Sequence, residues 1–60
     1  MDNATIRIEA VPPDHAPFRW DWYVHVWKKE GGMLRYNFNC VSGSHQLADD
    51  VAKSMAEAME

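Results

Sequence analysis

Hydrophobic and polar residues alternate along three segments of the chain. Between Phe18 and Val26 every even position is apolar, and the odd positions mix charged, polar and aromatic side chains. The same alternation resumes from Met33 to Val41, again with its large apolar side chains at even positions, and a shorter run covers Thr5 to Val11. A period of two is typical of strands that bury one face. The pattern therefore predicts three strands.

The period changes to about four residues near the C-terminus. Leu47, Val51, Met55 and Met59 recur every four positions, with alanines between them. This spacing places them on one face of an amphipathic helix. Ser44 is a good N-cap candidate, because its hydroxyl can accept a hydrogen bond from the first turn.

These elements predict an α+β fold in a single small domain, residues 1–60. The expected architecture is a three-stranded antiparallel meander with one C-terminal helix packed on one face (βββα). Three prolines between positions 12 and 17 mark the connection that follows the first strand. Phe18, Trp20 and Trp22 are expected to lie beneath the helix and to anchor the core.

The loop between the second and third strands determines which side chains share a face. If the even positions of both strands are buried, the loop needs an odd number of residues. A three-residue loop over positions 29–31 meets this condition. It would pair Trp22 with Phe38, Val24 with Tyr36 and Val26 with Leu34. On this reasoning a two-residue Gly-Gly turn is rejected, because it would place core residues opposite surface residues.

The sheet face away from the helix is then the candidate interaction surface. Tyr23 and Trp27 lie out of phase with the expected core, and Tyr, Trp and Arg are enriched at binding hot spots. An ordinary structural role, in which Trp27 covers the sheet edge beside Met33, is the alternative. The predicted partner-binding residues are Arg7, Arg19, Tyr23, His25, Trp27, Arg35, Asn37 and Asn39.

Charge is distributed unevenly along the chain, and its net value is −3. Residues 1–41 are balanced, whereas residues 42–60 carry one lysine against four acidic residues. A basic surplus is usual for nucleic-acid binding. The charge therefore favours a protein partner. The acidic helix face (Asp49, Asp50, Glu57, Glu60) could imitate phosphates in a basic groove, although such a face is usually only solvated.

Nucleic acid stays an alternative partner because of the order of elements. A three-stranded sheet followed by one helix resembles plant AP2-type domains and the arm-binding domains of phage integrases, whose sheets enter the major groove. The resemblance lies in element order and implies a DNA-binding sheet face. Tyr23 and Trp27 could stack on bases in that setting.

Catalytic and metal chemistry find little support in the sequence. A single cysteine excludes an internal disulfide. Cys40 is at an even position, on the face that is expected to be buried, and a thiol in the core is inert. His15, His25 and His45 match no usual zinc spacing. No glycine-rich phosphate loop is present. We therefore expect no enzyme activity, no metal and no cofactor.

The sequence thus predicts a small, non-enzymatic interaction module. It contains no apolar run of membrane-spanning length and no secretory signal, so a cytoplasmic location without membrane association is expected. A protein partner is favoured, and a homo-oligomer is compatible with so small a core. Small acidic proteins of this kind are often regulators or inhibitors, including those that phages encode against host or defence complexes.

Overall fold

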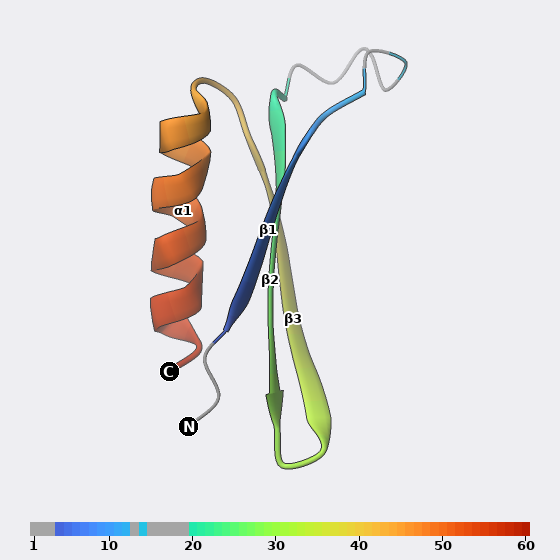
Figure 1. Cartoon of the computed structure of the whole chain (residues 1–60), viewed down its shortest axis with the longest axis vertical. Helices are drawn as coiled ribbons and strands as arrows, with labels where there is room; N and C mark the ends of the chain where they lie inside the picture. The colour runs from blue at the N-terminus through green and yellow to red at the C-terminus, as the bar shows by residue number, and fades with distance from the viewer. Residues whose placement is uncertain (1–3, 13, 15–19) are drawn as a thin grey trace.

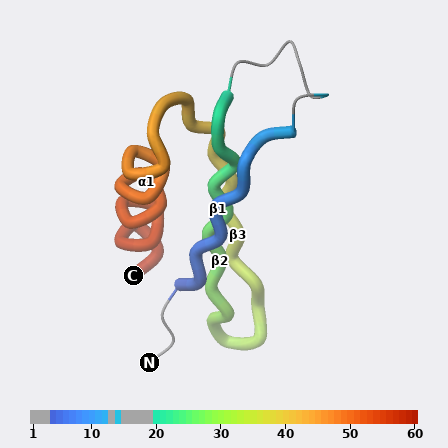
Figure 2. Tube along the Cα trace, turned by 45° about the horizontal axis from the view of Figure 1, so that its top comes forward, coloured from blue at the N-terminus to red at the C-terminus, as the bar shows by residue number. Residues whose placement is uncertain are grey.

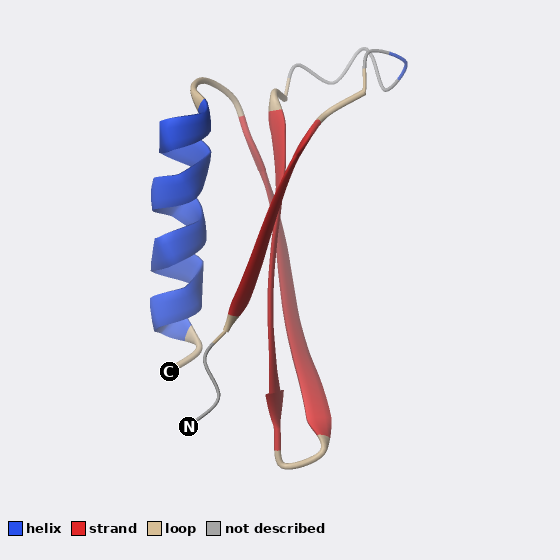
Figure 3. Cartoon of the chain, viewed as in Figure 1, coloured by secondary structure: helices blue, strands red, loops and turns tan. Residues whose placement is uncertain are grey.

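The structure is a computed structural model that describes residues 4–12, 14 and 20–60. It contains β1 (Thr5–Ala10), β2 (Trp22–Glu30), β3 (Met33–Val41) and α1 (His45–Ala58), in that order (Figures 1 and 3). The predicted βββα architecture is confirmed. Phe18, which the sequence placed in the core, and His15 lie outside the described residues.

The three strands form one antiparallel sheet in the order β1-β2-β3, and α1 lies against one of its faces (Figure 1). The helix packs mainly on β2 and β1 and touches β3 least. The tip of the β2–β3 hairpin extends past the C-terminal end of α1, as Figure 2 also shows. The far part of the hairpin is therefore exposed on both sides. No helix in the described part of the chain is long and apolar enough to span a membrane.

The observed hairpin turn differs from the predicted three-residue loop. Glu30 pairs directly with Met33, so the loop is the two-residue Gly31–Gly32 turn. Both glycines have positive φ, 59° and 80°. A turn of this kind suits the right-handed twist of the flanking strands and favours residues that tolerate a positive φ, glycine above all. The Gly-Gly turn, which was rejected on the assumption that even positions of both strands are buried, is the turn that forms.

The observed turn shifts β3 by three residues relative to the prediction, and a shift by an odd number turns every side chain of β3 to the other face of the sheet. Val26 pairs with Asn37 and Val24 with Asn39, whereas the predicted partners were Leu34 and Tyr36. Two contacts agree with this register. The ring of Phe38 meets the ring of Tyr23, which points away from α1, and Arg35 donates a hydrogen bond to the carbonyl of Met59 at the end of α1.

Among the residues that the structure describes, the buried core is small and consists mostly of short side chains. It comprises Val24, Val26, Val41, Ala48, Ala52 and Met59. The prediction of a tryptophan-centred core beneath the helix was wrong in two places: Trp20 precedes β2 and is 45% exposed, and Leu47 is 46% exposed. Trp22 packs partly buried at the margin of this core, where its Nε1 donates to the carbonyl of Gly43. Alanines hold α1 close to the sheet, which leaves room for valines and not for large rings.

The β3–α1 connection is held by side-chain hydrogen bonds. The Asp21 carboxylate accepts from the backbone N–H of Gly43, at 2.6 Å, and from the hydroxyl of Ser42. Ser44 caps α1 as predicted, its Oγ accepting from the N–H of Leu47 at 3.1 Å. These bonds determine where the helix starts relative to the sheet.

Candidate interaction face

The side of the sheet that faces away from α1 is called the open face. Because side chains alternate along a strand, the observed register brings together three sets of residues there. β1 contributes Thr5, Arg7 and Glu9, β2 contributes Tyr23, His25, Trp27 and Lys29, and β3 contributes Leu34, Tyr36, Phe38 and Cys40. The open face is thus rich in aromatic rings and carries few charges.

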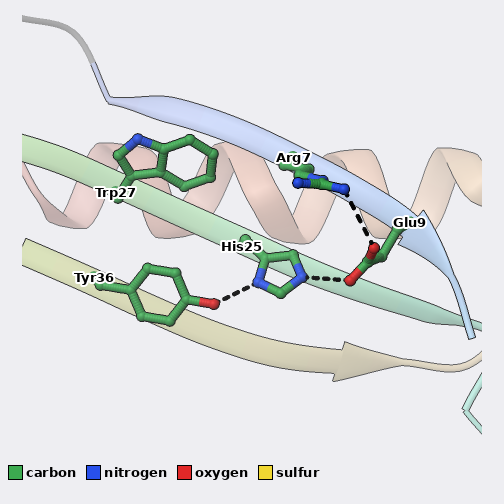
Figure 4. A pocket seen from close by; sticks show the side chains of 5 residues that line it. All are labelled: Arg7, Glu9, His25, Trp27 and Tyr36. Carbon is green, nitrogen blue, oxygen red and sulfur yellow. Dashed lines mark hydrogen bonds and ion pairs between the residues drawn. The ribbon is translucent and has the colours of Figure 1, made fainter.

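A shallow hollow of about 270 Å³ lies at the centre of the open face and opens to solvent. Figure 4 shows the five side chains that line it, with α1 on the other side of the sheet. All three strands contribute to it. The lining residues are Arg7, Glu9, His25, Trp27 and Tyr36.

A chain of hydrogen bonds crosses the hollow from β1 to β3 through His25. The imidazole Nε2 lies 2.9 Å from Oε1 of Glu9, and Nδ1 is hydrogen-bonded to the hydroxyl of Tyr36. A carboxylate is acceptor-only, so Nε2 carries a hydrogen and donates it to Glu9. In the neutral imidazole Nδ1 then accepts from the Tyr36 hydroxyl. This chain determines the orientation of all three side chains.

Among the described residues that line the hollow, Arg7 is the one arginine or lysine. Its Nη2 lies 3.6 Å from Oε2 of Glu9. Both side chains are substantially exposed, so the pair contributes little to stability. The carboxylate of Glu9 is thus shared between Arg7 and the imidazole of His25, and the Arg7 side chain stays largely exposed to solvent.

The aromatic rings of the open face pack against one another across the strands. The Phe38 ring lies 5.4 Å from that of Tyr23 and 5.1 Å from that of His25, centroid to centroid. Trp27 is the direct cross-strand neighbour of Tyr36. Such separations are those of favourable tilted ring pairs. The rings are therefore oriented before any partner arrives.

Part of this aromatic surface is accessible to solvent. The side chains of β3 are the most exposed of the group, with Leu34 at 59%, Tyr36 at 52% and Phe38 at 48%. Large apolar side chains that gather on one face and stay half-exposed are typical of binding sites. Isolated ones would need no such explanation.

The structure brings together half of the predicted partner-binding residues. Arg7, Tyr23, His25 and Trp27 share the open face, as alternation along β1 and β2 predicted. Arg19 lies outside the described residues. The predicted placement of the three β3 residues was wrong, because the two-residue turn exchanges the two faces of that strand. Arg35, Asn37 and Asn39 project to the side of the sheet that carries α1.

Sequence reasoning missed the β3 contribution to the open face. Leu34, Tyr36 and Phe38 were assigned to the core because they are large and apolar. The Gly31–Gly32 dipeptide was the available signal, since two consecutive glycines between alternating segments favour a two-residue hairpin. Cys40 also lies on the open face and not in the core. It is half-buried opposite Tyr23.

The acidic helix residues are partly paired within α1. Asp49 lies 3.3 Å from the ammonium of Lys53, and Asp50 accepts from the side chain of Gln46. Among the residues that the structure describes, no three His, Cys, Asp or Glu side chains gather in a way that could hold a metal ion.

Comparison with protein-family models, curated proteins and solved structures finds no match for this chain.

Proposed function

We propose that this chain is a small protein-binding module that docks on its partner through the open face and thereby regulates or inhibits it. The observation that supports this proposal is the preorganised aromatic cluster around His25. Tyr23, Trp27, Tyr36 and Phe38 surround it on a face that α1 leaves uncovered. Rings held in place before binding lose little conformational entropy when a partner covers them.

The composition of the open face suits a protein surface. Binding hot spots are rich in Trp, Tyr and Arg, surrounded by contacts that exclude water. Here Trp27, Tyr36 and Arg7 line one hollow, and Leu34 and Phe38 flank it. A partner side chain that enters the hollow would meet a cation, a carboxylate and ring faces within one small volume.

Charge argues against nucleic acid as the partner of the open face. Phosphate backbones are bound by a surplus of Lys and Arg. The Arg7 guanidinium is shared with Glu9, and the whole chain carries a net charge of −3. The acidic-mimic alternative is also weakened, because Lys53 pairs with Asp49 and reduces the negative charge of α1.

The test is a comparison of proteins captured by tagged variants of the full chain. Trp27→Ala and Arg7→Ala each alter the hollow, and neither residue lies on β3. Asn37→Ala changes an exposed residue on the opposite side of the sheet and serves as the matched control. A genuine partner is retained by the wild type and the control and is lost from both hollow variants. Circular dichroism confirms that the variants are folded.

Two outcomes would contradict the proposal. Equal capture by the wild type and the hollow variants would show that the open face does not bind. Tight, salt-sensitive binding of random single- or double-stranded DNA, measured by fluorescence anisotropy, would favour the nucleic-acid alternative.

A further inference from the structure

The outer edge of β3 has properties that the proposed function does not explain. β3 is an edge strand of nine residues, and every side chain from Met33 to Asn39 is exposed. Natural edge strands are usually protected by lysines, prolines, bulges or short length. The pairing of β3 with β2 runs without a bulge from Met33 to Val41. β3 contains no proline, and Arg35 is its one charged residue.

The opposite edge of the sheet is different. β1 has only six residues, and its sequence includes the charged residues Arg7 and Glu9. Two prolines, Pro12 and Pro13, follow it closely. A partner strand would therefore find a short, charged edge at β1 and a long, nearly uncharged one at β3.

The backbone groups that β3 turns outward can be identified from the hairpin. In a two-residue hairpin the residues next to the loop, here Glu30 and Met33, hydrogen bond to each other, and the pattern alternates along the strand. Arg35 and Asn37 then direct their N–H and C=O groups toward β2. The residues that direct them away from the sheet are Leu34, Tyr36, Phe38 and Cys40.

One hydrogen bond supports this assignment and marks where the available edge ends. The N–H of Cys40 donates to Oδ1 of the adjacent Asn39, at 2.9 Å, and could not do so if it pointed at β2. Among the described residues, no backbone group bonds to the outward N–H groups of Leu34, Tyr36 and Phe38. Three successive outward residues are therefore open to another strand.

We propose that a second copy of this chain occupies the edge, and that β3 pairs with β3 antiparallel about a two-fold axis at Tyr36. In this register Tyr36 lies opposite Tyr36, and Leu34 lies opposite Phe38 of the other copy. The two chains exchange six backbone hydrogen bonds, which use the outward N–H and C=O groups of Leu34, Tyr36 and Phe38 in both copies. Shifting the axis to Asn37 would leave Leu34 opposite Cys40, whose N–H is already bonded.

The side chains are compatible with this self-pairing on both faces. On the open face, Tyr36 and the pairs of Leu34 with Phe38 bring together apolar groups that are about half-exposed in one copy. On the other face, Arg35 lies opposite the neutral Asn37, so that no like charges oppose each other. Arg35 is already neutralised in part by Glu30, 3.5 Å away.

Because the core of one copy is small, association would bury apolar surface that a single copy leaves exposed. The largest fully buried side chains in the described part of the chain are the valines Val24 and Val26. Half-exposure leaves on the order of 100 Å² of each β3 ring accessible. With Leu34, Met33 and the strand backbone, pairing would cover several hundred Å² per copy, the lower range of specific interfaces. The product is one six-stranded sheet whose two open faces are continuous.

The oligomeric state of the full chain tests the proposal by sedimentation equilibrium. The wild type is expected at twice the 6.9 kDa chain mass at micromolar concentration. The variant Leu34→Lys/Phe38→Glu places opposite charges across the axis and should still dimerise. Leu34→Lys/Phe38→Lys removes the same apolar groups but places like charges across the axis, and should dimerise at least about tenfold more weakly.

The register is tested by pulsed electron resonance on a spin label at Cys40, the single cysteine. Pairing about Tyr36 separates the two labelled backbones by about 27 Å, whereas an axis at Asn37 or Phe38 would give about 20 or about 14 Å. A wild-type monomer at high micromolar concentration, equal dimerisation by the two charge variants, or one of the shorter distances would overturn the proposal. A face-to-face dimer would appear as the loss of dimer in both charge variants.

Discussion

The hairpin register makes opposite predictions for two apolar residues that the sequence expected to be core partners. Val26 is fully buried in the structure, whereas Leu34 is more exposed than buried and points to the open face. We therefore expect Val26→Ala to be the more damaging substitution, although leucine is the larger side chain. A three-residue loop would have made both substitutions costly.

The magnitudes follow from burial. Val26→Ala removes two buried methyl groups and leaves a cavity beneath α1, which costs about 1.5–3 kcal/mol of unfolding free energy. The total stability of a chain of this length is about 3–9 kcal/mol. The thermal midpoint should therefore fall by about 10 °C or more. Leu34→Ala loses only the buried minority of its surface, about 1 kcal/mol or less.

Urea unfolding followed by circular dichroism measures both free energies. The measurement is made at low micromolar concentration and repeated at a tenfold lower one, because association would add stability that depends on concentration. Leu34→Ala that costs as much as Val26→Ala at both concentrations would refute the observed register.

Two further predictions concern the turn and the hollow. At Gly32, where φ is positive and no atom lies within 4 Å of an added Cβ, L-alanine should cost about 1–2 kcal/mol in urea unfolding, because chirality is the sole obstacle. D-alanine should stabilise by about 0.4–1 kcal/mol, and equal effects of the two isomers would contradict the assigned turn. At His25, ¹⁵N NMR under conditions that keep the imidazole neutral should find the hydrogen on Nε2, held there by Glu9. Glu9→Ala should mix the two tautomers, and a wild-type hydrogen on Nδ1 would refute the proposed bond directions.

The arrangement of the open face explains why one chain could both associate and bind a partner. The hollow around His25 is built largely from β1 and β2, with Tyr36 as the β3 contribution. The proposed self-pairing uses the outward backbone of β3 and keeps its side chains on the same face. Association would therefore place two hollows on one continuous sheet and leave the β1 and β2 sides of each accessible.

Much of the fold follows from local patterns in the sequence. Alternation identified three strands, the four-residue period identified α1, and Ser44 was recognised as its cap. These inferences depend on neighbours along the chain, where periods of two and 3.6 residues are physically distinct. The same alternation placed Arg7, Tyr23, His25 and Trp27 on one face of the sheet.

The relation between strands was decided by tertiary structure. Alternation separates the two faces of a strand but does not say which face of β3 joins which face of β2. That choice rests on whether the loop has an odd or an even number of residues, since a register shift by an odd number turns every side chain to the other face. The assumption that Leu34, Tyr36 and Phe38 must be buried was wrong because a narrow, alanine-lined helix contact accommodates valines and leaves β3 largely uncovered. The sequence by itself therefore determined the elements and their order, and the packing of α1 with the Gly31–Gly32 turn decided which side chains form the open face.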